Sequence, residues 1–330
     1  MNNTNTLYVC FVKNKHLLPR EIIEMLKNND KDIQVEEIQT NVLVFKNGEI
    51  RPQIETSVRK KDVILISTME ENINIELVKT MLYINALHLA GAERIELWMP
   101  FFYYGRQDKT GDKREPVSAA MFASTYEKFG VSQFVTVHVH NEAIQGFFQN
   151  QFDKLGTKKL FWKHIENFCM ERDSFFNQND WIIIFPDEGA AKPCRDFEKK
   201  TGAGGHAGFS KYRSKENEVE SVDFFGDVKG KKCLIFDDMI DTGGTLAKAA
   251  ESLVKQGAKE VFAACTHALL NGNGPEVLQK SPMTKVFVTD SVYISDEKKF
   301  PKLEIISLAP MISACMIKNY NGESIRQENW

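Results

Sequence analysis

Short apolar runs recur along the chain, and each is followed by a longer stretch whose apolar residues have helical spacing. This alternation is typical of strands and helices that take turns in an α/β fold. Several runs are apolar at consecutive positions, as expected for strands of a parallel sheet that is covered on both faces. The predicted strands are residues 7–12, 62–67, 95–100, 134–139, 181–186, 232–237, 260–266, 285–289 and 304–308.

The amphipathic stretches between these runs predict helices. Several of them are followed directly by glycine, at Gly91, Gly130 and Gly257, which is a common helix stop signal. A last apolar stretch, 311–320, predicts one more short helix near the end of the chain. The other predicted helices are residues 19–27, 75–90, 117–129, 160–170 and 246–256.

A polar stretch at residues 149–159 separates two sets of strand–helix units, and a length of 330 residues favours two domains. We therefore predict an α/β protein with two similar domains, each a mostly parallel sheet flanked by helices. The predicted domains are residues 1–150 and 151–308. The pattern leaves open which half the helix and tail at 309–330 join, and we assign them to the first.

Composition narrows the classes of partner. The 42 Lys and Arg residues against 45 Asp and Glu give a net charge of −3, so no overall field draws the chain to nucleic acid or to an anionic membrane. The 6 cysteines include no CxxC pair, and we expect reduced thiols. No signal-peptide pattern and no apolar run of about 18 residues is found. We expect a cytoplasmic protein that binds neither nucleic acid nor membrane.

The strongest local signal lies at residues 233–246, where a buried strand leads through a glycine-rich turn into a helix. Gly243 and Gly244 let bare backbone approach a ligand, and the first N–H groups of the helix are unpaired at its positive end. Thr242 and Thr245 add hydroxyl donors. The segment predicts a phosphate cradle, although it is not a P-loop, because no Gly-Lys-Ser/Thr sequence closes it.

Asp237 and Asp238 at the strand end would repel a phosphate, but adjacent carboxylates are good acceptors for a vicinal diol. A ribose 5-phosphate satisfies both requirements. Taken singly, Asp241 or Thr242 would more often be a helix cap than a ligand. The whole string 237–245, however, resembles the phosphoribosyl diphosphate loop shared by type I phosphoribosyltransferases and ribose-phosphate diphosphokinases.

The rest of the chain resembles the ribose-phosphate diphosphokinase family over nearly its whole length. The resemblance implies two domains of the type I phosphoribosyltransferase fold. It rests mainly on residues 99–119, 138–148, 185–192 and 210–219. Smaller matches lie at residues 45–49, 57–59, 266–267 and 321–324.

The resemblance implies an ATP site in the first half of the chain. From the residues alone, an Arg-Gln-Asp triplet in a charged loop is an ordinary solvated turn, although it has the fork donor and carboxylate to grip phosphate and sugar. An aromatic ring with polar neighbours is a plausible purine pocket. The implied ATP-binding residues are Phe45, Asn47, Glu49, Arg106, Gln107, Asp108 and His140.

A magnesium ion, bound together with ATP, is implied by the same resemblance. His140 follows an apolar strand and Asp187 follows another, and open α/β sheets bind ligands at this edge. A single histidine there is more often structural. The family match assigns metal binding to His140 and Asp187, and Mg²⁺ suits few protein ligands because it retains water and phosphate oxygens.

Lys211 and Arg213 lie in a stretch with little apolar periodicity, after the glycine-rich residues 202–208. The glycines match a dinucleotide fingerprint by letter, but no buried strand precedes them and no apolar helix follows, so we reject that interpretation. We expect a mobile segment that carries both cations over a closed site. Surface charge is the ordinary interpretation of Lys-x-Arg, whereas the resemblance makes Lys211 and Arg213 the catalytic pair.

The implied reaction transfers the β,γ-diphosphoryl group of MgATP to the anomeric hydroxyl of ribose 5-phosphate, giving 5-phosphoribosyl 1-diphosphate and AMP. The chain departs from the family pattern at His138, at Ala190 and at residues 308–310. The last of these replaces a regulatory segment, so the resemblance implies catalysis but not activation by free phosphate or inhibition by ADP.

Two alternatives remain at this point. A non-catalytic regulatory homologue would have no need to keep Lys211, Arg213, His140 and the loop 237–245 together. A type I phosphoribosyltransferase would share the loop but not the implied nucleotide residues of the first half. The resemblance also implies self-association, to a dimer at least and to a hexamer in our assignment.

Overall fold

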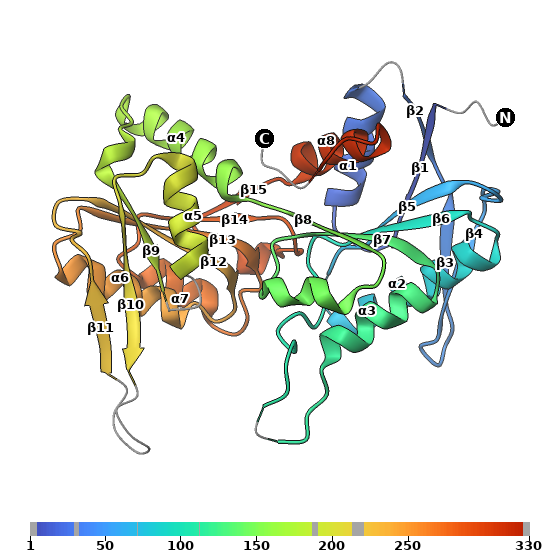
Figure 1. Cartoon of the computed structure of the whole chain (residues 1–330), viewed down its shortest axis with the longest axis horizontal. Helices are drawn as coiled ribbons and strands as arrows, with labels where there is room; N and C mark the ends of the chain where they lie inside the picture. Colours follow the sequence, from blue (N-terminus) through green and yellow to red (C-terminus); the bar gives the residue numbers. More distant parts are fainter. Residues whose placement is uncertain are drawn as a thin grey trace. The chain divides into compact units, whose positions relative to one another are not determined.

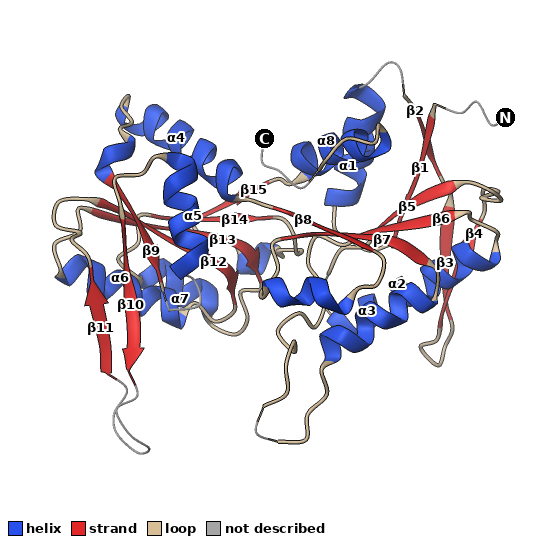
Figure 2. Cartoon of the chain, viewed as in Figure 1, coloured by secondary structure: helices blue, strands red, loops and turns tan. Residues whose placement is uncertain are grey.

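The computed structural model describes residues 5–29, 33–70, 72–111, 113–186, 191–212 and 221–325. The chain forms two compact units (Figures 1 and 2). The first holds the described residues up to Gly156, together with Ser291–Tyr293 and those from Ser307 onward. The second holds Thr157–Asp290 and Ile294–Ile306. No described helix is long and apolar enough to cross a membrane.

The first unit is built on a six-stranded sheet in the order β2-β1-β5-β6-β7-β8, with every neighbouring pair parallel. Its strands are β1 (Thr6–Phe11), β2 (Gln34–Glu37), β5 (Asp62–Ile66), β6 (Arg94–Trp98), β7 (Val131–Val137) and β8 (Gln151–Leu155). A separate antiparallel hairpin is formed by β3 (Thr40–Val44) and β4 (Ile50–Ile54). The helices are α1 (Leu18–Asn29), α2 (Ile73–Leu89), α3 (Ser118–Lys128) and α8 (Ala309–Tyr320), with the 3₁₀ turn η1 (Glu142–Phe147).

Helix α8 packs beside α1, although the two helices lie at opposite ends of the sequence (Figure 1). A partly buried polar contact fixes its last turn, because Asn319 Nδ2 donates to Glu96 Oε2 at 2.9 Å and Gln133 Nε2 donates to Asn319 Oδ1 at 3.1 Å. Burial raises the pKa of Glu96, while hydrogen bonds from Trp98 and Asn319 oppose that rise. The C-terminal helix is thus part of the first unit.

The second unit is built on a seven-stranded sheet in the order β11-β10-β9-β12-β13-β14-β15, in which only β10 and β11 pair antiparallel. Its strands are β9 (Trp181–Phe185), β10 (His206–Tyr212), β11 (Ser221–Phe225), β12 (Lys232–Ile240), β13 (Glu260–Ala268), β14 (Lys285–Thr289) and β15 (Leu303–Ile306). The helices are α4 (Lys158–Asp173), α5 (Ala191–Thr201), α6 (Gly244–Lys255) and α7 (Gly274–Lys280), with 3₁₀ turns η2 (Gln178–Asp180) and η4 (Asp296–Lys298).

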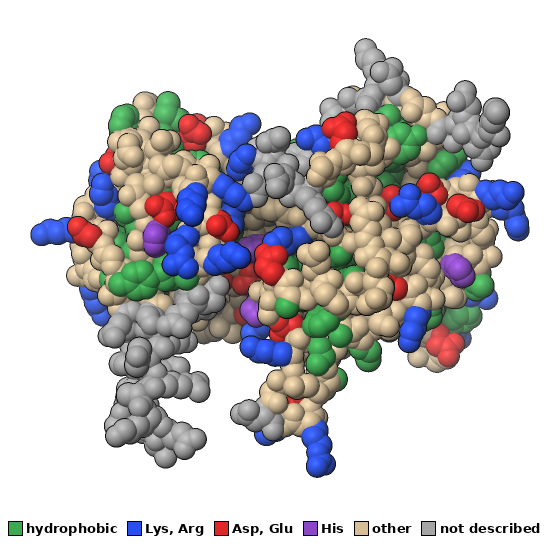
Figure 3. All heavy atoms as spheres, viewed as in Figure 1, with side chains coloured by type: hydrophobic (Ala, Val, Ile, Leu, Met, Phe, Trp, Pro, Cys, Tyr) green, Lys and Arg blue, Asp and Glu red, His purple; other side chains and the backbone are tan. Residues whose placement is uncertain are grey.

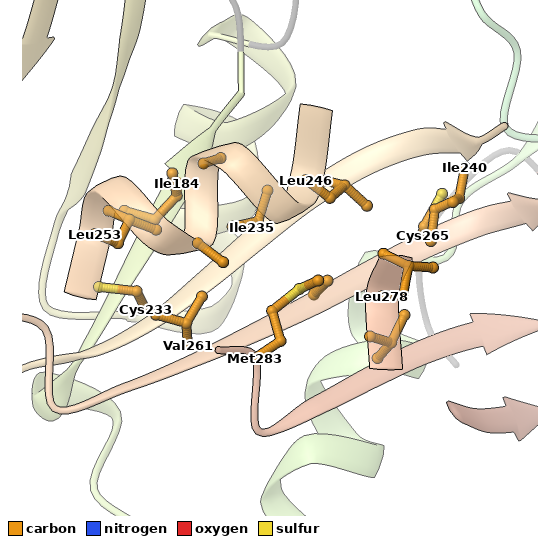
Figure 4. Packing of buried hydrophobic residues seen from close by; sticks show 14 of the residues in the cluster. Ile184, Cys233, Ile235, Ile240, Leu246, Leu253, Val261, Cys265, Leu278 and Met283 are labelled. Atoms are coloured by element: carbon orange, nitrogen blue, oxygen red, sulfur yellow. The ribbon is translucent and has the colours of Figure 1, made fainter. Parts of the chain in front are cut away.

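Both faces of this second sheet are covered. Leu246 and Leu253 of α6 and Leu278 of α7 pack over Ile235 and Val261 of the strands (Figure 4). The opposite face carries an aromatic core under α4 and α5. Its buried members include Phe161, Trp162, Trp181, Phe197 and Phe236. Burial on both sides explains why the strands read as unbroken apolar runs.

The predicted fold class is confirmed, and every predicted strand and helix is found with ends shifted by a few residues. The elements that the pattern missed are β2, β3, β4, β8, β10, β11, α5 and α7. Most of them carry polar residues at half-exposed positions, which weakens the apolar signal. The polar stretch 149–159 is partly a strand, since β8 forms the edge of the first sheet.

Candidate functional site

The loop at residues 237–245 lies where the strand order of the second sheet reverses. Strand β9 has β10 on one side and β12 on the other, and β10 follows β9 in the chain. Open α/β sheets bind ligands at such a switch point, beyond the carboxyl ends of the strands. The sequence placed the end of this strand at Asp237, but β12 continues to Ile240, so Asp237 and Asp238 lie in its last part.

Gly243 connects β12 to α6 in a conformation that needs glycine. Its φ is +72°, and an added Cβ would lie 2.8 Å from Cγ of the buried Leu278 in α7. Gly244, by contrast, has nothing within 4 Å of an added Cβ. The first intrahelical bond runs from the Ala247 N–H to the Gly243 carbonyl at 3.0 Å. The earlier N–H groups of α6 have no partner within the helix, as at every helix start.

Helix capping does not account for the polar residues of the loop, because no side chain caps α6. Asp241 is instead held by the segment before α7, where Asn271 Nδ2 donates to its Oδ1 at 2.9 Å and the Asn271 N–H donates to its carbonyl at 2.9 Å. Thr242 and Thr245 are exposed. A positive helix end beside exposed hydroxyl groups has the chemistry of an anion-binding site.

Asp237 and Asp238 are half-buried neighbours, and the Asp238 N–H donates to Asp237 Oδ1 at 2.9 Å. Cys265 of the adjacent strand β13 lies buried near them. Burial raises the pKa of the Cys265 thiol well above its usual range, and the charges of Asp237 and Asp238 raise it further. The cysteine therefore stays a neutral thiol, and the two carboxylates remain the local acceptors.

The carboxylates also fit a hard cation. Among the residues that the structure describes, no group of three or more His, Cys, Asp or Glu side chains is arranged as a metal cage. Mg²⁺ does not require one, because it is usually held by one or two carboxylates, with water and substrate phosphates as its other ligands. Asp237 and Asp238 of β12 meet that requirement. Asp187, which the family resemblance assigns to the metal, lies outside the described residues.

Lys211 lies in strand β10, an element that the sequence pattern did not predict. That strand pairs with β9 only from His206 to Gly208, and it then continues past the end of β9 while paired with β11. Lys211, opposite Val222, is therefore on an antiparallel arm that extends beyond the carboxyl edge of the sheet. Arg213 lies outside the described residues.

Of the glycine-rich residues 202–208, Gly208 lies within β10 and the other glycines precede that strand; the mobile segment stays a prediction. Gly202, Gly204 and Gly205 form the turn between α5 and β10, at the edge of the sheet opposite to the carboxyl ends of its parallel strands. A Cβ on Gly204 would lie 2.4 Å from the carbonyl oxygen of Asn179, and the Gly204 N–H donates to the Trp181 carbonyl at 2.9 Å. These glycines allow close backbone packing.

In the first unit, the residues implied for ATP come partly together. The loop after β6 carries Arg106, Gln107 and Asp108, and His140 follows the adjacent strand β7. Asn141 Nδ2 donates to Asp108 Oδ2 at 2.6 Å, which links the two loops next to His140. The sequence analysis did not single out Asn141, although it lies in the family-like segment 138–148.

Local contacts fix the loop after β6 from inside. Ser118 Oγ donates to Gln107 Oε1 at 2.6 Å, so the side-chain amide oxygen of Gln107 is hydrogen-bonded to the first residue of α3. Tyr104 and His138 have positive φ angles of 61° and 43°, which few residues other than glycine adopt. Such outliers gather at binding sites, and these two flank the exposed Arg106 and His140.

Phe45, Asn47 and Glu49 lie on a different element, the turn of the β3–β4 hairpin. The Phe45 N–H donates to the Glu49 carbonyl at 2.9 Å, and Asn47 Oδ1 accepts from the Glu49 N–H at 3.2 Å. The Phe45 ring is exposed and has the Arg51 guanidinium 5.2 Å from its centre. An exposed ring on a rigid turn is a suitable surface for a planar ligand.

The fold and the loop define the class of protein: two phosphoribosyltransferase-like units, each built on a mostly parallel sheet, the second of which has a strand, a glycine turn and a helix in succession at residues 232–255. Residues 9–130 match the N-terminal domain of ribose phosphate pyrophosphokinase, and residues 200–328 match the phosphoribosyl synthetase-associated domain. The chain belongs to the ribose-phosphate pyrophosphokinase family.

Individual relatives agree. A ribose-phosphate pyrophosphokinase of Aquifex aeolicus is 35% identical over 86% of this chain and 88% of its own length, and one of Clostridium acetobutylicum is 36% identical over 84% of each. The crystal structure of phosphoribosylpyrophosphate synthetase from Mycobacterium smegmatis superposes with a TM-score of 0.85 at 30% identity, over 97% of this chain and 100% of that one. The family predicted from the sequence is confirmed.

The two glycines of the loop give a matched pair of variants. We expect Gly243→Ala to lower the stability of the second unit by about 1–2 kcal/mol or more, because a left-handed alanine is strained and its Cβ displaces Leu278. Gly244→Ala meets no neighbour, so we expect its unfolding midpoint in urea to equal that of the parent while ribose 5-phosphate binding weakens. Equal midpoints for both variants would contradict this account of the turn.

Proposed function

We propose that the protein is a ribose-phosphate diphosphokinase that converts MgATP and ribose 5-phosphate into 5-phosphoribosyl 1-diphosphate and AMP for nucleotide biosynthesis. The anomeric oxygen attacks the β-phosphorus, the bond from this phosphorus to the oxygen that bridges it to the α-phosphorus breaks, and AMP leaves with that oxygen. The proton of the hydroxyl passes to solvent as the new ester forms. The loop from Asp237 to Thr245, in a chain that matches this family along both units, carries the proposal.

Ribose 5-phosphate has a defined place in this proposal. Its phosphate lies over the first N–H groups of α6, with the exposed Thr242 and Thr245 hydroxyls beside it. The ribose diol then faces Asp237 and Asp238. Asp241, Gly243 and Gly244 shape the turn between these parts, and Asp187 completes the ribose-binding set. The negative acids and the positive helix end thus bind different parts of one substrate.

We assign ATP to the first unit. Arg106, Gln107 and Asp108 approach the nucleotide with His140, while Phe45, Asn47 and Glu49 bind the adenine. The bond between Asn141 and Asp108 supports this assignment, because it holds the Arg106 loop against the loop of His140. We assign Mg²⁺ to His140 and Asp187 together with the phosphate oxygens; it would neutralise charge on the transferred group.

Lys211 and Arg213 are the proposed catalytic cations. Phosphoryl transfer requires alignment and charge neutralisation from the protein more than covalent chemistry. The position of Lys211 on an arm beyond the carboxyl edge of the sheet supports this role, since the ribose phosphate loop lies at the same edge. The paired strands of the arm would position it more firmly than a loop.

We also propose self-association, to a dimer at least and to a hexamer in our assignment. Helix α2 buries Leu77, Ile84 and Leu87 in its own unit. It also exposes an apolar stripe on its other side, ending at Leu89, which is 77% exposed. The stripe consists of Ile75, Val78, Leu82 and Leu89. A helix that is apolar on both sides is typical of one covered by a partner.

Three further assignments rest on the family and the sequence. The protein acts in the cytoplasm and requires neither nucleic acid nor membrane. Leu308 and Ala309 replace the regulatory segment and are completely buried in the first unit. Pro310, the third residue of this segment, is exposed, and we make no assignment for activation by free phosphate or inhibition by ADP.

Phosphorus NMR of the protein with ATP, Mg²⁺ and ribose 5-phosphate tests the function. We expect AMP to grow in step with a new diphosphate ester. Formation of ADP would mean transfer of a single phosphoryl group and would contradict the proposal. Binding of ATP without any turnover would favour the non-catalytic regulatory homologue.

Lys211→Ala tests the catalytic cation. Loss of a charge that stabilises the transition state costs several kcal/mol, so we expect kcat to fall by at least about a hundredfold with little change in the unfolding midpoint. Lys229→Ala, an exposed lysine on the turn before β12, is the control and should keep its activity. Turnover of Lys211→Ala within about tenfold of the parent would remove Lys211 from the mechanism.

The apolar stripe is tested by Val78→Glu/Leu82→Glu, which places two charges on it. We expect sedimentation to show a smaller assembly than for the parent, because a desolvated carboxylate in an interface is strongly unfavourable. Val254→Glu changes a similarly exposed apolar residue of α6 and serves as the control. An unchanged assembly state for the double variant would exclude this surface as the interface.

A further inference from the structure

Charges are segregated on α5, one of the helices of the second unit. Its basic residues Lys192, Arg195, Lys199 and Lys200 are all exposed, whereas both of its acidic residues are half-buried. One of these acids, Glu198, is paired with His206, with Oε2 2.5 Å from Nδ1. The positions 192, 195 and 199 lie on one side of the helix. The exposed charges of α5 are therefore mainly positive, with Asp196 and Glu198 only partly exposed between them.

Helix α4 adds to these positive charges. It contacts α5 over the same face of the sheet, where Trp162 of α4 packs against Phe197 of α5 with ring centres 6.0 Å apart. The N-terminal half of α4 carries Lys158, Lys159 and Lys163, and its first acidic residue is Glu166. Lys and Arg side chains gather over this part of the second unit (Figure 3). We call the basic residues of α4 and α5 together the basic face.

The basic face begins at the edge of the sheet that carries the ribose phosphate loop. α5 follows β9, and β9 pairs with β12, whose carboxyl end carries Asp237 and Asp238. The start of α4 lies at the same edge, because Thr157 Oγ1 is 2.9 Å from Oγ1 of Thr266 near the end of β13. Both first turns, with three of the lysines, thus lie at the carboxyl edge.

Helix stability does not explain these lysines. Negative side chains are favourable in the first turn of a helix and positive ones are unfavourable, because of the helix dipole. Neither α4 nor α5 has an acidic residue in its first turn, and both have lysine there. The whole chain has a net charge of −3, so the basic face is also not a reflection of composition. A local role for positive charge would account for lysine in both first turns.

We propose that the basic face attracts phosphorylated sugar dianions and guides them along α5 to the loop at residues 237–245. This rests on the proposed function, since ribose 5-phosphate is the substrate. A surface of one charge sign raises the local concentration of an opposite ion, and its range is the Debye length, about 10 Å at 0.1 M salt. The stripe from Lys192 to Lys199 spans about 10 Å, at about 1.5 Å per helical residue.

The test reverses the distal charges only, with Arg195→Glu/Lys199→Glu. At an ionic strength of about 0.03 M, we expect kcat/KM for ribose 5-phosphate to fall about fivefold or more while kcat is unchanged, a loss within the range of electrostatic focusing. At about 0.5 M the two proteins should become equal, because the field is screened. At the low ionic strength, kcat/KM of the neutral variant Arg195→Gln/Lys199→Gln should lie between those of the parent and of Arg195→Glu/Lys199→Glu.

The matched control is Lys229→Glu/Lys259→Glu, which makes the same change in net charge with two exposed lysines at the other edge of the sheet. Its kcat/KM for ribose 5-phosphate should equal that of the parent at each salt concentration. Equal kcat/KM for parent and Arg195→Glu/Lys199→Glu at every salt concentration, an equal loss in the control, or a fall in kcat that salt does not remove would each overturn the inference.

Calorimetric titration with ribose 5-phosphate separates this inference from the proposed function. If the parent makes no product, yet its affinity for ribose 5-phosphate at low salt falls on charge reversal, the basic face is supported and the diphosphokinase is not. If the parent makes product and the affinity is unchanged by charge reversal, the diphosphokinase stands and the basic face has no such role.

Discussion

The proposed ribose phosphate site depends on one backbone turn, the left-handed Gly243 between β12 and α6. With a φ of +72° and Leu278 directly behind it, this residue sets the direction in which α6 leaves the sheet. That direction determines where the unpaired N–H groups of α6 point, and therefore where a phosphate can bind. The segment before α7 reinforces the turn through Asn271 and Asp241, so the loop is fixed from behind and open in front.

Around this turn, parallel sheet geometry gathers groups of opposite charge at one edge of the second sheet. The acids of β12 lie beside the positive end of α6, and the Lys211 arm and the basic face border the same edge. A ligand with a diol at one end and a phosphate at the other satisfies both signs of charge. In the first unit, a bond between two adjacent loops holds Asp108 near His140 in a comparable position, after neighbouring strands.

The sequence predicted the parts of the fold and site that depend on local pattern. Buried strands and the strand–glycine–helix segment 233–246 have strong local signals, so the sheets and the loop were found. β8 was missed because its residues Gln151 and Asp153 are polar, the latter buried through a bond from Gln133. Strand β10, which carries Lys211, was missed because β10 and β11 are defined by their pairing with each other and have little apolar pattern of their own. The spacing of the glycines likewise does not show that Gly204 packs against Asn179. Roles of single residues came from the family resemblance.

The most direct test of the account is hydrogen–deuterium exchange of the protein with and without ribose 5-phosphate. A phosphate bound over the first turn of α6 occupies backbone N–H groups that otherwise have no helical partner, so it should slow their exchange. The account predicts that peptides covering residues 241–247 gain the largest protection, and that Gly244→Ala reduces it. Unchanged exchange in these peptides, with protection elsewhere in the second unit at saturating ligand, would contradict it.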